Sequence, residues 1–299
     1  MFRLLRPVLR HPWRLQDPRW YQITVLAGLC AYGMVWLDFA VSAGQAGAIL
    51  GTALLTQWLG NRLWQGVAYD PRSALISGLS LCLLLRTTRL SLLVLTAGLS
   101  IASKFVLRWR GKHLFNPTNF GLVAMMLLTD QVWVSPGQWG NAAFFAFLLA
   151  GLGGLVVLRA ARSDVSYAFL TCHIALRASR AWWLGDPWSI PLHQLQHGAL
   201  ILFTFFMLSD PRTTPDSRLG RCLFAALVAL GTWYVQFRWY RSDALLWSLA
   251  ACSLLVPLLD VFFPGPRYTW PLDALPRGEP QNQKQDQRLQ GDADVRHCL

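Results

Sequence analysis

The chain has 299 residues, of which 54% are hydrophobic and only 14% are charged, and its mean hydropathy is +0.34. Soluble domains carry roughly 25% charged residues, so this composition excludes an ordinary soluble protein. The formal charge of +12 does not indicate nucleic-acid binding, because the basic residues punctuate apolar segments and do not gather in one polar domain. The composition predicts an integral membrane protein.

Ten apolar segments follow one another along the chain, when a bilayer span is taken as roughly 20 residues. They are 22–41, 45–63, 73–86, 90–107, 118–134, 142–158, 166–184, 192–208, 219–236 and 244–263. The third is short, and His173, Arg177 and Arg180 interrupt the seventh. We therefore predict an all-α polytopic protein with about ten transmembrane helices in residues 22–265. A basic cytoplasmic segment (1–21) precedes them, and a disordered polar tail (266–299) follows.

The basic residues predict the orientation of these spans. With the N-terminus in the cytoplasm, 21 of the 27 Lys and Arg residues fall on the cytoplasmic side. The positive-inside rule therefore predicts that both termini lie in the cytoplasm. The expected location is the inner or plasma membrane of the cell. The other six are Arg86, Arg89, Arg177, Arg180, Arg238 and Arg241.

Ten spans divide into two halves of five, residues 22–140 and 141–265. Because five is an odd number, the second half has the opposite orientation in the membrane to the first. Two short matches support such a repeat. Asp70-Pro71-Arg72-Ser73 precedes the third segment, and Asp186-Pro187-Trp188-Ser189 precedes the eighth; Arg86-Thr87-Thr88 and Arg212-Thr213-Thr214 follow the same two segments. We predict an inverted-topology repeat.

Motifs of soluble enzymes are missing. Five of the six cysteines lie inside apolar runs, with neither CxxC nor Cys/His spacing, so we predict no metal site and no disulfide framework. The chain has no Walker loop, GxGxxG, GxSxG or HExxH motif. No catalytic residue is therefore assigned, and the chain is not expected to act as an enzyme by itself.

The stretch Lys112–Gly121, KHLFNPTNFG, places polar residues where the fifth span begins. Pro117 suits the first position of a helix, and Asn116 can cap its free N–H groups. Helix capping is the favoured interpretation, and Asn116 and Asn119 are also candidates to donate hydrogen bonds to a ligand, since amides at a membrane boundary need partners.

Two further groups of polar residues are candidates. One is a proline-rich turn after the eighth span, which contains Asp210, Arg212, Thr213 and Thr214. Its function is either to gate a transport path or to dock a partner subunit; the alternative is that it only terminates the eighth span. His193 and His197, four residues apart, have a spacing that can ligate haem or a metal, although interfacial hydrogen bonding explains them better.

Three stretches together resemble one family. They are Ser73–Leu79 (SALISGL), Lys112–Gly121 and His193–Pro215 (HQLQHGALILFTFFMLSDPRTTP). The family is the membrane subunit shared by sodium-pumping NADH:quinone reductases and Rnf electron-transport complexes, NqrB/RnfD. The chain resembles a divergent stand-alone member of the kind that also occurs beside enediyne natural-product clusters.

The resemblance implies two inverted five-helix halves, as in urea transporters, and a flavin. The family esterifies FMN to a threonine in an S-x-A-T loop, but residues 121–193 contain no such loop, so no covalent FMN is expected. A non-covalent FMN or riboflavin at Asn116, Pro117 and Asn119 is the cofactor that the resemblance implies.

The expected function is that of a membrane subunit in ion transport and electron transfer. Its expected partners are lipid and other membrane redox or transport subunits, and no nucleic acid. The alternative is a transporter or channel that moves a small solute or natural product without redox chemistry.

Overall fold

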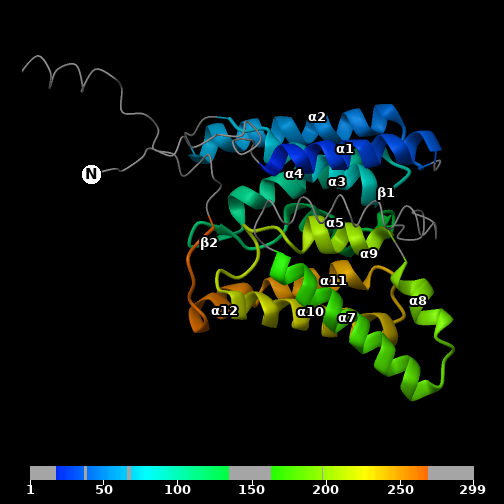
Figure 1. The fold of residues 1–299 in the computed structure, drawn as a ribbon. Helices are drawn as coiled ribbons and strands as arrows, with labels where there is room; N and C mark the ends of the chain where they lie inside the picture. The colour runs from blue at the N-terminus through cyan, green and yellow to red at the C-terminus, as the bar shows by residue number, and fades with distance from the viewer. Residues whose placement is uncertain (1–17, 37–38, 66–68, 135–162, 197, 269–299) are drawn as a thin grey trace, which may run out of the picture. The chain divides into compact units, whose positions relative to one another are not determined.

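The computed structural model describes residues 18–36, 39–65, 69–134, 163–196 and 198–268, which are mostly helical (Figure 1). The helices of the first part of the chain are α1 (Pro18–Trp36), α2 (Ala43–Gly60), η2 (Asn61–Gln65), α3 (Arg72–Leu84), α4 (Leu90–Val106) and α5 (Pro117–Leu128). Those of the second part are α7 (Ser163–Leu184), α8 (Ser189–Leu195), α9 (Gly198–Leu202), η4 (Phe203–Met207), α10 (Arg218–Arg238), α11 (Ala244–Ser253) and α12 (Val256–Phe262). Short strands form two antiparallel pairs, β1 (Leu85–Arg86) with β4 (Trp133–Val134) and β2 (Arg108–Trp109) with β3 (Lys112–His113). The all-α fold class is confirmed.

Several helices are shorter than a bilayer span. Helix α3 has 13 residues and α5 has 12, and α11 is separated from α12 by a break with a bend of 48°. The break falls where Pro257 stands in the first turn of α12, because proline lacks the N–H that would continue the helix of α11. By length and composition, α10 alone among the described helices is long and apolar enough to cross a membrane, and the bent pair α11–α12 is a second candidate. The number of ten spans thus stays a prediction.

The helix packing has a similar pattern in the two parts of the chain. Helix α2 packs on α4 and α4 on α5, while α7 packs on α10 and α10 on α11. Close approach depends on small residues in both places. A Cβ atom on Gly121 of α5 would lie 1.8 Å from Ser100 Oγ of α4, and one on Gly231 of α10 would lie 2.4 Å from Ser248 Oγ of α11. Helix α5 also contacts α3 and α11, so it joins the two parts.

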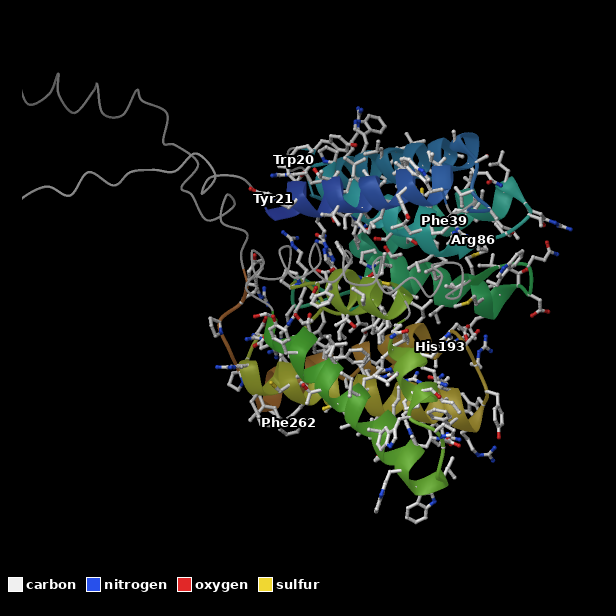
Figure 2. The ribbon with its side chains drawn as sticks, turned by 45° about the vertical axis from the view of Figure 1, so that its right-hand side comes forward. Trp20, Tyr21, Phe39, Arg86, His193 and Phe262 are labelled. Carbon is white, nitrogen blue, oxygen red and sulfur yellow. The ribbon has the colours of Figure 1, made fainter. Side chains whose placement is uncertain are left out.

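The side chain of Arg86, two residues beyond helix α3, binds the C-terminal end of that helix. Its guanidinium group is buried and donates to the carbonyl oxygens of Cys82, Leu83 and Leu85, at distances of 3.1, 3.1 and 2.6 Å. It also lies 5.5 Å from the centre of the Phe39 ring, and Figure 2 labels both residues. A cation at this place satisfies carbonyl groups that a helix end leaves free and stabilises the negative end of the helix dipole.

Ion pairs are grouped as the charge count predicts. Each of the following pairs joins two residues that the predicted topology places at the same end of the spans: Arg19–Asp70, Arg72–Asp70, Lys112–Asp216, Lys112–Asp260, Arg221–Asp164, Arg180–Asp186 and Arg241–Asp243. The first five belong to the predicted cytoplasmic end and the last two to the opposite end. The grouping agrees with spans that cross between two polar layers.

Some predictions fall on parts of the chain that the structure does not describe. These are the sixth span (142–158), most of the basic N-terminal segment, the polar tail after Tyr268, and His197. The predicted eighth span (192–208) differs in detail, since it is divided among α8, α9 and the π-helix η4.

Candidate functional site

The N-terminus of α5 is built by its own sequence. Asn116 is the N-cap residue, its Oδ1 atom accepts the backbone N–H of Asn119 at 3.2 Å, and Pro117 occupies the first turn. Proline there costs no hydrogen bond, because the first N–H groups of a helix have no partner inside the helix. The predicted cap is present.

The same two asparagines tie α5 to the second part of the chain. Asn116 Nδ2 donates to the carbonyl oxygen of Met207, the last residue of η4, at 3.3 Å. Asn119 Nδ2 donates to the carbonyl oxygen of Leu246 in α11 at 3.1 Å. Both side chains are buried, and Asn119 is 0% exposed. These bonds satisfy buried amide groups and carbonyl groups that would otherwise lose free energy on leaving water.

The three sequence blocks that resemble one family meet at this place. Thr118 Oγ1 donates to the carbonyl oxygen of Ser77 in α3 at 3.3 Å, and Lys104 Nζ donates to Ser73 Oγ at 3.1 Å. With the Asn116–Met207 bond, these contacts bring together Ser73–Leu79, Lys112–Gly121 and the end of His193–Pro215. Blocks far apart in the sequence thus form one buried polar junction, centred on the start of α5.

The loop after η4 is a tight turn. The carbonyl oxygen of Asp210 accepts the N–H groups of Thr213 and Thr214 at 3.2 Å, and its Oδ1 atom accepts the N–H of Arg212 at 3.0 Å. Thr213 and Thr214 are buried, whereas Arg212 is exposed. Both charged residues of the turn act on the junction electrostatically, since Asp210 attracts the buried ammonium group of Lys104 and Arg212 repels a proton on His113.

Lys112 joins β3 to the end of the chain's helical part. Its Nζ atom lies 3.0 Å from Asp216 Oδ1 and 2.7 Å from Asp260 Oδ2, and Asp260 Oδ1 accepts the backbone N–H of Asp216 at 2.7 Å. We call this group the lysine clasp. A pocket of about 110 Å³ lies beside it and is lined in part by Trp109, His113 and Arg267.

Sequence reasoning missed the partners of Lys112. One signal was available, because Asp260 is the single acidic residue in the apolar run of α11 and α12, and an ionisable residue at such a place needs a partner. Its partner lies 148 positions away in the sequence, however, and spacing alone does not identify it.

His113 is held neutral. Burial, together with the positive charges of Arg212, Lys104 and Arg108, lowers the pKa of its imidazole to about 3. The side chain is 8% exposed, and its Nδ1 atom is buried without a hydrogen-bond partner among the described residues. It therefore contributes polarity to the junction without adding charge at neutral pH.

The remaining candidates lie elsewhere. His193 is exposed on α8, at the far end of α9 and η4 from the junction (Figure 2). His197 is outside the described residues, so the predicted histidine pair cannot be assembled. In the parts of the chain that the structure describes, no three His, Cys, Asp or Glu side chains are placed to hold a metal ion.

The asparagine pair does not fit a flavin in this packing. Three of its four side-chain polar groups are engaged, and within the described ranges only Asn119 Oδ1 has no partner. That atom is fully buried, so a planar three-ring isoalloxazine would have to displace the bond to η4 or to α11 in order to reach it.

Comparison with known proteins supports the third block, His193–Pro215, which lies inside the matched range, whereas Ser73–Leu79 and Lys112–Gly121 lie outside it. Residues 124–268, just under half of the chain, match the model of the NQR2, RnfD, RnfE family. The chain is similar to the RnfD protein of the ion-translocating oxidoreductase complex of Escherichia coli O1:K1, with 33% identity over 126 residues, which are 42% of this chain and 34% of that protein. The protein of the same name from Cronobacter sakazakii is 31% identical over 128 residues, 42% of this chain and 35% of its own length. The chain thus spans about a third of the length of these curated relatives, and the resemblance to the NqrB/RnfD family is confirmed.

Proposed function

We propose that this chain, whose residues 124–268 carry the sequence of the NQR2, RnfD, RnfE family, is an integral membrane subunit of an ion-translocating oxidoreductase complex. Its place is the inner or plasma membrane, with both termini in the cytoplasm. Its partners are lipid and the other membrane redox subunits of such a complex.

The polar junction at the start of α5 is the observation that carries this proposal. It gathers the ends of helices that are too short to cross a bilayer, α3, α5 and η4, and it buries amides, hydroxyl groups and a lysine among them. The ends of broken helices form the ion and substrate sites of many transporters, because their free backbone groups are polar, and this junction gathers such ends near the predicted cytoplasmic side. The similar packing of α2–α4–α5 and α7–α10–α11 supports the inverted repeat as part of the same proposal.

Two versions of this function differ in cofactor. In the redox version, a non-covalent FMN or riboflavin binds at Asn116 and Asn119. In the transport version, the chain moves a small solute or an ion between the two halves and holds no flavin. The hydrogen bonds that occupy both asparagines favour the transport version.

One experiment separates the versions. The full chain is purified in detergent, its flavin content is measured by absorbance and fluorescence, and it is then reconstituted into proteoliposomes for flux measurements with Na⁺, H⁺ and small neutral solutes. Flux without flavin supports the transport version. Flavin near one per chain supports the redox version, provided that Asn116→Ala with Asn119→Ala releases it and leaves the protein folded. A chain that is found outside the membrane fraction contradicts both.

A further inference from the structure

A second buried polar cluster lies far from the junction, where α7, α8 and α10 meet. Its centre is Arg177, which is 9% exposed. Arg177 Nε donates to His173 Nε2 at 2.8 Å, one terminal nitrogen donates to Gln194 Oε1, and the other donates to Gln236 Oε1 at 2.6 Å. All three partners are neutral side chains.

Arg177 lacks the carboxylate partner that three other largely buried cations have, and among the buried cations Lys104 likewise donates to a neutral group, Ser73 Oγ. Arg19, Lys112 and Arg221 each contact a carboxylate within 3.0 Å. Arg86 contacts the carbonyl groups at the end of α3. No carboxylate in the described part of the chain contacts Arg177, and a buried unpaired charge is costly.

Two donors of the guanidinium group are still available. Arginine has five N–H groups, and the three hydrogen bonds use one on each nitrogen, which leaves one on each terminal nitrogen. Such a pair can hold two oxygen atoms of a phosphate or carboxylate group.

His173 provides a further donor without an acceptor. Its Nε2 atom accepts from Arg177, so a neutral imidazole carries its proton on Nδ1. That Nδ1 atom is buried and has no partner among the described residues, and the side chain is 2% exposed. The cluster as a whole thus has donors and positive charge, and it lacks acceptors.

The surface around the cluster has the composition of a membrane interface. Arg180 lies one turn further along α7, over the Phe237 ring at 4.0 Å, and is 3.5 Å from Asp186. Large aromatic side chains at the adjoining ends of α7, α8 and α10 are exposed. This aromatic rim consists of Trp182, Trp183, Trp188, Tyr234, Trp239 and Tyr240. Tryptophan and tyrosine prefer the level of the lipid headgroups.

We propose that Arg177 and Arg180 bind the phosphate group of an anionic phospholipid, with His173 held behind Arg177 and the aromatic rim against the acyl chains and glycerol. The lipid supplies the negative charge that the described part of the chain does not supply to Arg177. Basic pockets between membrane helices bind anionic headgroups on the cytoplasmic side of membranes, and Arg177 and Arg180 would form such a pocket at the opposite end of the spans. The proposal rests on the membrane location in the proposed function and not on its cofactor or its transported species.

The test uses the full chain in detergent. Melting temperature is measured during titration with phosphatidylglycerol or phosphatidylcholine, and native mass spectrometry counts the lipids bound. Phosphatidylglycerol is expected to raise the melting temperature in a concentration-dependent manner, since a ligand that binds only the folded state stabilises it. Arg180→Gln is expected to weaken the apparent affinity by about fivefold, and Arg177→Gln to abolish the effect.

A second arginine variant serves as the control for a general loss of positive charge. Arg62→Gln removes an exposed arginine that lies 5.5 Å from the Trp58 ring, and it is expected to leave the lipid effect unchanged. The Arg177→Gln variant also loses three internal hydrogen bonds and is therefore at risk of not folding. In that case the response of the Arg180→Gln variant to phosphatidylglycerol tests the lipid site.

Three results overturn the proposal: phosphatidylcholine protects as well as phosphatidylglycerol, inorganic phosphate at equal concentration protects as well as the lipid, or the Arg180→Gln and Arg62→Gln variants respond alike. The proposed function fails separately, if the chain is found outside the membrane fraction of the cells.

Discussion

Asn116 has two tasks at the junction, since its Oδ1 atom caps α5 and its Nδ2 atom contacts Met207. A cap alone contributes about 1 kcal/mol, and a buried hydrogen bond adds about 1 kcal/mol more. Ser42 offers a matched control, because it caps α2 through the N–H of Gln45 without joining the two parts of the chain.

The Asn116→Ala variant is therefore expected to lose about 2 kcal/mol of unfolding free energy, and Ser42→Ala about half as much. Thermal unfolding of both variants in the same detergent checks this. Equal losses in the two variants would show that the bond to Met207 contributes nothing.

The lysine clasp is a second feature at the scale of single residues. Lys112 and Asp216 have side chains that are 10% and 12% exposed, so removing the lysine leaves buried carboxylates without a counter-charge. We expect Lys112→Met to cost about 3 kcal/mol or more, whereas Arg180→Gln, which breaks a pair whose side chains are 33% and 32% exposed, costs below about 1 kcal/mol in lipid-free detergent. The measurement is again thermal unfolding. Adding Asp216→Asn and Asp260→Asn to Lys112→Met should restore part of the loss, and no recovery would contradict the charge argument.

His113 predicts a pH dependence. Its pKa is lowered to about 3 in the folded protein, mainly by burial, while the pKa in the unfolded chain is near the ordinary value of 6.5. The unfolded chain therefore binds the extra proton between these two values, so the stabilisation present above pH 6.5 is lost as the pH falls. Between pH 6.5 and 5 the loss is up to about 2 kcal/mol. Melting temperatures at these two pH values should differ less for His113→Asn than for the unaltered chain; an equal difference contradicts the assignment.

At the scale of elements, the contact of α4 with α5 depends on Gly121. A methyl group at this position would meet Ser100 Oγ at 1.8 Å and the carbonyl oxygen of Thr96 at 3.0 Å, and the latter belongs to the backbone and cannot rotate away. Gly98, on α4, has its nearest atoms at 3.9 Å.

Alanine should thus act in opposite directions at these two glycines. We expect Gly121→Ala to destabilise the protein by about 1 to 3 kcal/mol through overpacking, and Gly98→Ala to stabilise it by up to about 1 kcal/mol through helix propensity. Unfolding in detergent measures both. A stabilised Gly121→Ala variant would contradict the close contact of α4 and α5.

Local features of the elements could be predicted from the sequence, and long-range ones could not. The cap at Asn116 and the helix start at Pro117 depend only on neighbouring residues, and both are present. The break between α11 and α12 had a local signal in Pro257, but an unbroken apolar run concealed it. Asp260, which pairs with Lys112, and Gln236, which pairs with Arg177, come from other helices, and hydrophobic periodicity does not encode which polar groups meet.

At the scale of the whole molecule, the predicted topology places two polar layers on opposite sides of a membrane. Helix α10 connects them, from Arg218 at the predicted cytoplasmic end to Arg238 at the other end. Family resemblance supports a membrane subunit over residues 124–268, while the orientation of the termini comes from the charge distribution alone.

Labelling from the two sides of the membrane tests this claim most directly. In a chain whose native cysteines are replaced, Arg218→Cys and Tyr240→Cys introduce single thiols at exposed positions at the two ends of α10. A membrane-impermeant maleimide is expected to label the Tyr240→Cys variant in intact cells (spheroplasts where an outer membrane is present) and the Arg218→Cys variant only after permeabilisation. The reverse labelling pattern would show that α10 crosses the membrane in the orientation opposite to the predicted one. Labelling of both variants from the same side would contradict the membrane-spanning architecture on which the account is built.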